Sequence, residues 1–291
     1  MVCIAVPEPT DKPQLLWLGF GDLAQAARPH LDAAGYTLVA ARRNCSQLPA
    51  SLPALAMDVT RPETLRALQA QAPHAVIITL TAAANEAAYR AVYVDGLANV
   101  IAALEASGTS PLLLFASSTS VYAQNDGSRV DELSATLPAG YSGRCMLEAE
   151  ALLQCSSLPA CAIRFSGIYG GQRNNHLLRV LQQGRVCPAV PAKYSNRIHV
   201  EDCARIFVHL LNRHCAGQPL APVYLACDNH PAPLRDVMLW LAAKHGIASE
   251  GLVGDYLPKR GGNKRCEAML LSAEGFVPRF ASYREGFAQA G

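Results

Sequence analysis

Residues 14–24 read QLLWLGFGDLA, an apolar run followed at once by small residues in the spacing GxGxxA. The run at 15–18 is continuously apolar, as in a parallel strand that is buried on both faces. Gly19 permits a tight turn, and Gly21 lets the backbone approach a ligand without an intervening Cβ atom. Ala24 is small enough for the next helix to pack on the strand. This order of strand, turn and helix predicts a site for the pyrophosphate of a dinucleotide.

The alternation of short apolar runs and helical stretches continues to about residue 165. We expect further strands at 36–41, 75–80, 112–116 and 160–164, and helices at 22–34, 62–71, 86–107, 143–154 and 201–212. The predicted fold class is α/β, a Rossmann-type doubly wound parallel sheet with a smaller C-terminal substrate-binding lobe. We expect a dinucleotide-binding domain at 14–169. Residues 170–291 should form mainly the substrate-binding lobe, with some segments returning to the Rossmann core.

The residues predicted to hold the dinucleotide surround the glycine turn and the ends of the next strands. They are Gly19, Phe20, Gly21, Asp22, Leu23, Arg42, Arg43, Asp58, Val59, Leu80 and Thr81. Proteins that bind NAD usually place an acid after the second strand, against the ribose hydroxyls. Arg42 and Arg43 stand there instead, and a guanidinium pairs with a 2′-phosphate, so we expect NADP rather than NAD. The alternatives are a solvated basic pair and, for Asp58, a turn residue ahead of Thr60 instead of an adenine ligand.

The composition favours a small molecule as the partner. The 291 residues include 25 basic and 23 acidic ones, a net charge of +2, so no basic field attracts nucleic acid or a membrane surface. No apolar run approaches the roughly 20 residues of a membrane span. The ten cysteines form no zinc spacing, so no metal site is expected. Prolines in residues 1–14 break any signal-peptide core, and we expect a cytoplasmic protein.

Hydroxyl side chains follow the strand expected at 112–116, since residues 117–122 read SSTSVY. Ligands bind at this end of the strands in open α/β sheets. Further along, 141–145 read YSGRC, 164–170 read RFSGIYG and 198–202 read IHVED. Over nearly its whole length the chain resembles the extended short-chain dehydrogenases/reductases, of the NAD-dependent epimerase/dehydratase type. Within them it is most similar to a YeeZ-like bacterial branch.

The resemblance implies hydride transfer on a small carbonyl or alcohol, or on a nucleotide-sugar-like substrate. It implies that Ser118 binds a substrate oxygen and that Tyr141 exchanges its proton. The other implied substrate contacts are Thr119, Arg164, Tyr169 and Arg197. The family's lysine, four residues after the tyrosine, is Cys145 in this chain. Arg144 lies on nearly the same helix face as Tyr141 and is the predicted replacement cation.

The missing lysine leaves the chemistry open, because a tyrosine with a pKa near 10 is only about 0.1% ionised at neutral pH. The alternative to an enzyme is therefore a catalytically impaired NADP-binding sensor or regulatory protein. Cys145 has no adjacent base and is expected to be a packing residue. For Arg164 and for His199, a purely structural role is the alternative to a role in the substrate site. The helices at 86–107 and 143–154 resemble those of a four-helix dimer interface in the superfamily, which implies a homodimer.

Overall fold

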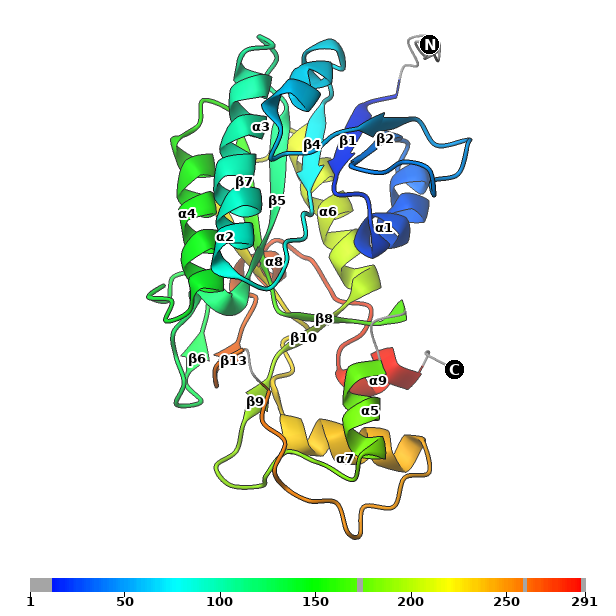
Figure 1. Cartoon of the computed structure of the whole chain (residues 1–291), viewed down its shortest axis with the longest axis vertical. Coiled ribbons are helices and arrows are strands. Elements are labelled where there is room, and N and C mark those ends of the chain that lie inside the picture. The colour runs from blue at the N-terminus through cyan, green and yellow to red at the C-terminus, as the bar shows by residue number, and fades with distance from the viewer. Residues whose placement is uncertain (1–11, 172–174, 259–260, 289–291) are drawn as a thin grey trace.

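A computed structural model describes residues 12–171, 175–258 and 261–288 of the chain (Figure 1). The expectation that no signal peptide precedes the fold rests mainly on residues 1–11, which lie outside the described residues. Among the helices that are described, none is both long and apolar enough to cross a lipid bilayer. The same residues contain no cluster of His, Cys, Asp and Glu side chains that could hold a metal ion.

A seven-stranded sheet forms the centre of the larger part of the molecule. Its order is β11-β7-β5-β4-β1-β2-β3, and every neighbouring pair is parallel. The strands are β1 Gln14–Leu18, β2 Thr37–Arg42, β3 Ala54–Ala56, β4 Ala75–Ile78, β5 Leu112–Ser118, β7 Ala160–Phe165 and β11 Val223–Ala226. The order runs outward from β1 in both directions. The predicted Rossmann-type doubly wound sheet is therefore confirmed.

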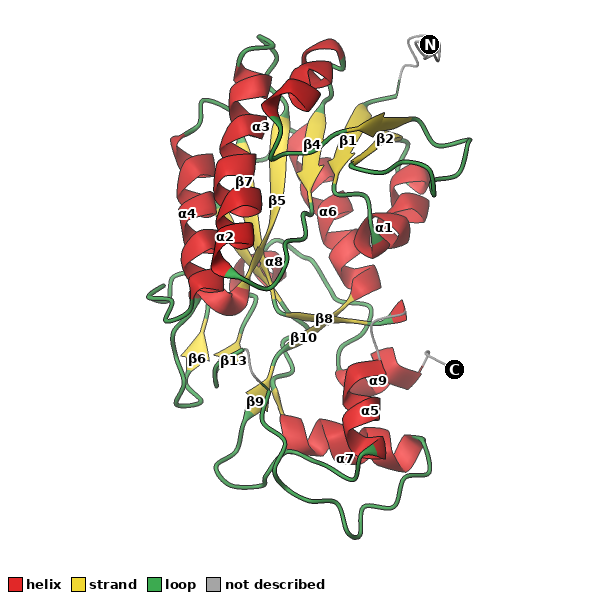
Figure 2. Ribbon diagram, in the orientation of Figure 1, coloured by secondary structure: helices red, strands yellow, loops and turns green. Residues whose placement is uncertain are grey.

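Helices cover both faces of this sheet (Figure 2). On one face α1 packs against α6, and on the other α3 packs against η1 and α4. The bounds are α1 Asp22–Ala33, η1 Pro62–Ala70, α2 Glu86–Tyr89, η2 Arg90–Asp95, α3 Gly96–Glu105, η3 Thr119–Val121, α4 Tyr141–Cys155, α6 Val200–Cys215 and α8 Met269–Ala273. Helix α6 and strand β11 come late in the chain, after residue 170, yet both pack with the sheet.

Three elements differ from the sequence prediction. Strand β4 ends two residues early, where the Thr79 hydroxyl accepts a hydrogen bond from the Trp17 indole and donates one to the Gly19 carbonyl. The segment expected as a helix at 62–71 is a 3₁₀ helix, because the Thr64 hydroxyl bonds to backbone groups just before it. The helix expected at 86–107 contains a π-helical stretch, η2.

The smaller lobe lies below the sheet in Figure 1 and has its own apolar core. It contains α5 Asn175–Gln182, α7 Leu234–Lys244, α9 Tyr283–Ala288 and the paired strands β9 Tyr194–Ser195 and β12 Ala232–Pro233. Strands β8 Gly167–Tyr169 and β10 Arg197–His199 pair between the lobe and the sheet. Strand β6 Arg129–Val130 pairs with β13 Arg265–Cys266 beside the larger part.

A buried ion pair joins the elements that carry the predicted reaction centre. Arg164 of β7 (5% exposed) donates hydrogen bonds to both carboxylate oxygens of Glu150 of α4 (2% exposed). Arg164 also donates to the Tyr122 hydroxyl at 2.9 Å, and Ser117 of β5 donates to Glu150 at 2.5 Å. Burial acts to lower the pKa of Arg164, but the bonds to Glu150 and its charge raise it above the usual value. The pair therefore holds β5, β7 and α4 together, with Arg164 charged.

We predict that Glu150→Ala destabilises the protein by about 3–5 kcal/mol, because it leaves the Arg164 charge buried without a partner. Asp255→Ala is the control. Asp255 pairs with Arg185 at the surface, so its loss should cost less than about 1 kcal/mol. Urea denaturation of the two variants measures both free energies. Equal costs would mean that the buried pair adds nothing beyond a surface pair.

Candidate active site

The glycine turn after β1 forms a cradle that the protein does not fill. Gly19 has a φ of +84°, and a Cβ atom there would lie 2.3 Å from the Thr79 carbonyl oxygen, so only glycine fits. At Gly21 a Cβ atom would meet nothing closer than the Gly19 carbonyl oxygen at 3.9 Å. The space beside Gly21 lies at the N-terminus of α1, which has no side-chain cap. This terminus suits a phosphate group.

A cavity of about 560 Å³ begins at this turn and follows the ends of β2 and β4. Its lining includes most of the predicted dinucleotide residues, namely Gly19, Phe20, Gly21, Arg42, Arg43, Asp58, Val59, Leu80 and Thr81. Asp22 and Leu23 line the adjoining cavity. Neither Arg42 nor Arg43 forms an ion pair with another described residue. Two cations therefore stand beside this cavity where an anion could join them.

Asp58 forms the turn that the sequence offered as one alternative, and it also lines the cavity. One carboxylate oxygen accepts hydrogen bonds from the Thr60 amide at 3.0 Å and the Thr60 hydroxyl at 2.8 Å, as in a turn. The same residue lines the cavity. Burial acts to raise the pKa of Asp58, but the bonds from Thr60 and the charges of Arg43 and Arg61 bring it below the usual value. Asp58 is therefore an ionised acceptor at neutral pH.

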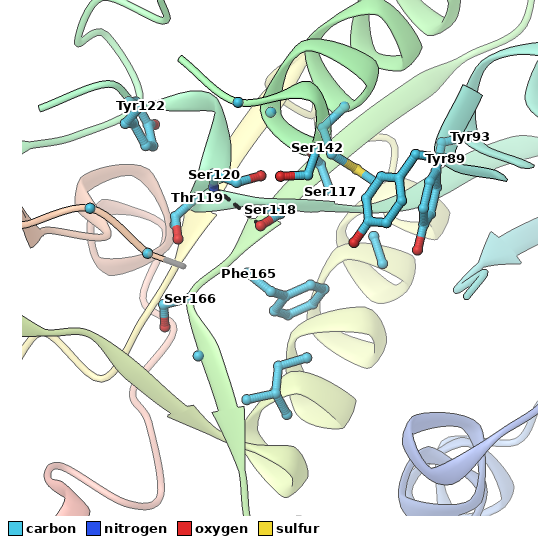
Figure 3. Close-up of a pocket in the computed structure, with 18 of the residues that line it drawn as sticks. Tyr89, Tyr93, Ser117, Ser118, Thr119, Ser120, Tyr122, Ser142, Phe165 and Ser166 are labelled. Atoms are coloured by element: carbon cyan, nitrogen blue, oxygen red, sulfur yellow. Dashed lines mark hydrogen bonds between the residues drawn. The ribbon is translucent and has the colours of Figure 1, made fainter. Parts of the chain in front are cut away.

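A larger cavity of about 1080 Å³ lies on the other side of the turn (Figure 3). Ser118, Thr119 and Tyr141 all line it, together with Gly19 and Gly21. The Ser118 Oγ accepts a hydrogen bond from the Ser120 amide at 3.1 Å, drawn as a dashed line in Figure 3. The proton of the Ser118 hydroxyl is therefore available for an oxygen atom in the cavity.

The position of Tyr141 depends on close packing at the start of α4. Two residues further on, a Cβ atom at Gly143 would lie 2.3 Å from the Ser120 carbonyl oxygen, so only glycine lets α4 approach η3 this closely. The Tyr89 ring packs edge-on against the Tyr141 ring, with centroids 5.3 Å apart. Tyr89 and Tyr93 line the same cavity, and Figure 3 shows Tyr89 and Ser118 on facing sides of it.

Arg144, the cation predicted beside Tyr141, is not among the described residues that line this cavity. Arg144 is exposed and donates to the Glu86 carboxylate and the Ala139 carbonyl, both at 3.1 Å. Cys145 is buried, and burial raises the pKa of its thiol. Neither residue belongs to the described lining of the cavity. The structure therefore brings Ser118 and Tyr141 together and leaves Arg144 outside.

Of the other predicted substrate residues, Arg164 is turned away from the cavity by its buried pair with Glu150, which supports the structural alternative. Tyr169 and Arg197 line a third cavity of about 350 Å³ in the smaller lobe. Arg197 is 7% exposed, and its guanidinium has no hydrogen bond or ion pair to any residue that the structure describes. Burial lowers the pKa of Arg197 to about 10. His199 accepts the Glu201 amide and so caps α6.

The three cavities adjoin one another. The cavity of about 1080 Å³ that Ser118 and Tyr141 line is called the reaction cavity below. It shares Gly19 and residues 79–81 with the cavity beside Arg42 and Arg43. It shares Thr119, Gly167, Ile168 and Lys193 with the cavity of the smaller lobe. The three cavities therefore offer an extended ligand a path from Arg42 and Arg43, past Ser118 and Tyr141, to the smaller lobe.

The family described as the RmlD substrate-binding domain matches residues 14–231. The chain belongs to this family. The family falls within the extended short-chain dehydrogenases/reductases, so the resemblance found in the sequence is confirmed. No curated protein matches the sequence.

Solved structures similar to this RmlD-type chain span almost all of it. A Methylobacillus flagellatus protein assigned to the NAD-dependent epimerase/dehydratases is 31% identical, with 96% of this chain and 97% of that one covered and a TM-score of 0.77. The Bordetella bronchiseptica enzyme WbmG, in complex with NAD, is 18% identical, with coverage of 97% and 94% and a TM-score of 0.79. The UDP-Glc/GlcNAc 4-epimerase of Campylobacter jejuni is 15% identical, with coverage of 93% and 95% and a TM-score of 0.75.

Some lining residues of this RmlD-type chain were not predicted from its sequence. They are Tyr89, Tyr93, Ser142, Lys193 and Lys264. A signal existed for the two tyrosines, which are four residues apart at the start of a predicted helix and therefore share one face. The two lysines lie in irregular segments, where no periodicity shows which way a side chain points.

We predict that Gly21→Val abolishes dinucleotide binding but leaves the melting temperature of the free protein within a few degrees, because the new side chain fills space that only a ligand would use. Gly19→Val is the contrasting variant and should unfold the protein, since its side chain would collide with the Thr79 carbonyl. Calorimetric titration with NADPH and thermal melts measure the two effects. Retained binding by Gly21→Val would show that the turn is only structural.

Proposed function

We propose that this chain is an NADP-dependent oxidoreductase or epimerase that transfers hydride at an alcohol or carbonyl carbon of a small substrate, such as a nucleotide sugar. The observation that carries the proposal is the reaction cavity, where Ser118 and Tyr141 line the same space as the glycine turn. Hydroxyl groups and a dinucleotide cradle meet there, as hydride chemistry on a carbon–oxygen bond requires.

The cradle supports a nicotinamide dinucleotide as the cofactor. The open space beside Gly21 and the uncapped start of α1 suit its pyrophosphate, and the cavity beside Asp58 and Val59 suits its adenosine. The name of the Methylobacillus relative and the NAD in WbmG support the same class of cofactor. Because Arg42 and Arg43 are unpaired among the described residues and line this cavity, we propose NADP rather than NAD.

The mechanism assigns one task to each hydroxyl. When bound, the nicotinamide supplies the donor or acceptor of the hydride. Ser118 donates its proton in a hydrogen bond to the substrate oxygen, while the bond from the Ser120 amide holds its Oγ in place. The Tyr141 phenol gives a proton to that oxygen during reduction, and its phenolate takes one during oxidation. The close packing of α4 on η3 fixes the backbone segments that carry the two residues.

The scarcity of carboxylates in the lining of the reaction cavity favours redox chemistry or epimerisation over dehydration. Within the part of the lining that the structure describes, the one carboxylate is that of Asp22, on the cofactor turn. Elimination of water needs an acid and a base at neighbouring substrate carbons. Ser118, Thr119 and Tyr141 offer hydroxyls at a single oxygen instead. We therefore propose that the substrate keeps all its oxygen atoms during the reaction.

Arg197 supports a phosphorylated substrate. Its guanidinium is buried without a hydrogen-bonding partner among the described residues and lines the cavity of the smaller lobe. The charge of the buried Asp228 acts on it, but burial raises the pKa of Asp228 to about 7, so this carboxylate neutralises Arg197 only in part. A buried cation is costly unless an anion joins it. A phosphate of the substrate bound there would leave the remainder of the substrate to reach Ser118 through the shared rim at Thr119 and Lys193.

The second candidate is an NADP-binding sensor with little or no turnover. It is favoured by the surroundings of Tyr141, where Cys145 replaces the family's lysine and Arg144 is paired with Glu86 instead. The hydroxyl arrangement around Ser118 argues for an enzyme, because a protein that only senses the cofactor needs no donor for a substrate oxygen.

We also propose that the chain forms a homodimer and acts in the cytoplasm. Helix α4 packs against α2 and η2, and Arg90 pairs with Glu148 across these elements. They therefore form one continuous surface of the kind that the four-helix interface of the superfamily uses.

Tyr141→Phe should lower kcat by about 10²–10⁴-fold on any nucleotide sugar that the wild type turns over with NADP(H), because general acid/base catalysis contributes this much. NADPH affinity should stay unchanged. Tyr36→Phe is the control, since the Tyr36 hydroxyl bonds to Asn212 and does not belong to the described cavity linings. If Tyr141→Phe keeps wild-type kcat, the acid/base assignment fails and the sensor becomes the better description.

NADPH should bind about ten- to a hundredfold more tightly than NADH, which corresponds to one charge-assisted contact of about 1.5–3 kcal/mol. Arg42→Asp should reverse this preference because an acid repels the 2′-phosphate and accepts the ribose hydroxyls. Arg66→Asp, an exposed residue of η1 outside the cavity, should keep it. Calorimetry with both dinucleotides decides, and equal wild-type affinities would remove the case for NADP.

A further inference from the structure

Lys264 places a buried ammonium group at the reaction cavity. The residue directly precedes β13, is 2% exposed and belongs to the cavity lining. Its Nζ donates hydrogen bonds to the carbonyl oxygens of Gly261 at 3.1 Å and Tyr122 at 3.4 Å. No carboxylate of the described residues pairs with it. The charge is thus held only by the partial charges of two carbonyl groups.

Lys193 adds a second positive charge to the same lining. Its Nζ donates to the Gly262 carbonyl at 2.7 Å, on the loop that leads to Lys264. Burial lowers the pKa of Lys264, and the charge of Lys193 lowers it further. Like charges near each other in a partly desolvated space are unfavourable until an anion lies between them. The described part of the chain supplies no such anion.

We propose that the reacting part of the substrate carries its own negative charge, a carboxylate or a phosphate, which binds to Lys264 and Lys193 in the reaction cavity. The inference rests on the proposed function and specifies its substrate class. It assigns an acidic sugar or another acidic alcohol or ketone in place of a neutral one.

The location separates this charge from the phosphate proposed at Arg197. Lys264 lines the reaction cavity with Ser118 and Tyr141 and is absent from the described lining of the lobe cavity. Arg197 lines the lobe cavity and is absent from the described lining of the reaction cavity. Lys193 lies at the rim that both share. A substrate with charges at both positions would be held at each end, with its reacting carbon beside Ser118.

The test uses the full chain saturated with NADPH and a matched pair of small probes, malonate and its neutral diamide malonamide. Calorimetry at constant ionic strength should show that the wild type binds malonate at least about tenfold more tightly than malonamide. Inorganic phosphate, titrated in parallel, shows which anion the site prefers. Lys264→Met should remove the preference, whereas Lys12→Met, at an exposed position, should keep it.

Thermal melts of the free protein separate this role from a structural one. If Lys264 serves a ligand, Lys264→Met should be as stable as the wild type or more so, because it replaces an unpaired buried charge with an apolar chain of similar length. A loss of stability together with unchanged anion binding would overturn the proposal. So would the absence of any preference for malonate or phosphate over malonamide in the wild type.

A competition with UDP locates the charge. If malonate still binds at saturating UDP, the site belongs to the reacting part of the substrate. If UDP displaces malonate, the lysines hold the diphosphate of a nucleotide and the proposal fails. These measurements need no turnover, so their failure is distinct from that of the proposed hydride transfer, which Tyr141→Phe tests.

Discussion

The buried pair of Arg164 and Glu150 is the interaction on which the candidate site depends. It joins β7 to α4, and through Ser117 and Tyr122 it also holds β5 and the segment that follows it. Those are the elements that carry Ser118 and Tyr141. An isolated charge at either position would be costly, so the pair is stable only when all the elements are in place. Arg164, which the sequence suggested as a substrate ligand, therefore holds together the elements that carry the site.

The charge of this chain is balanced overall and uneven locally. The net charge is +2, yet the cavities are lined by cations that form no salt bridge with a described carboxylate: Arg42 and Arg43, Lys193 and Lys264, and Arg197. Asp58 and Asp228 act on Arg43 and Arg197 only through their charge. Each set lies at a different stretch of one continuous space. Under the proposed function, these cations would face the phosphates of the dinucleotide and the negative charges of its co-substrate.

The sequence was sufficient for five of the seven strands of the sheet and for the glycine turn, because buried parallel strands are continuously apolar and the glycine turn has one required spacing. It did not predict β11, β8 or β10, whose pairing is set by contacts far along the chain. For the site, local pattern located Ser118 and Tyr141, each beside a strand or helix end. It predicted Arg144 beside Tyr141, whereas the structure pairs Arg144 with Glu86 outside the described lining, because helical spacing gives a face but not the competing partner. No local pattern indicated Lys264, because only the tertiary fold brings this residue to the cavity.

The contact between Gly143 and the Ser120 carbonyl has a consequence for the entropy of binding. Because α4 and η3 approach each other closely through this glycine, the backbone segments that carry Ser118 and Tyr141 are held at a fixed separation. The site is preorganised, and a substrate pays little to order it. The smaller lobe has a separate apolar core, so substitutions within it can reshape its cavity without changing the contact between α4 and η3. Changes in substrate range should therefore accumulate in the lobe, while the chemistry stays constant.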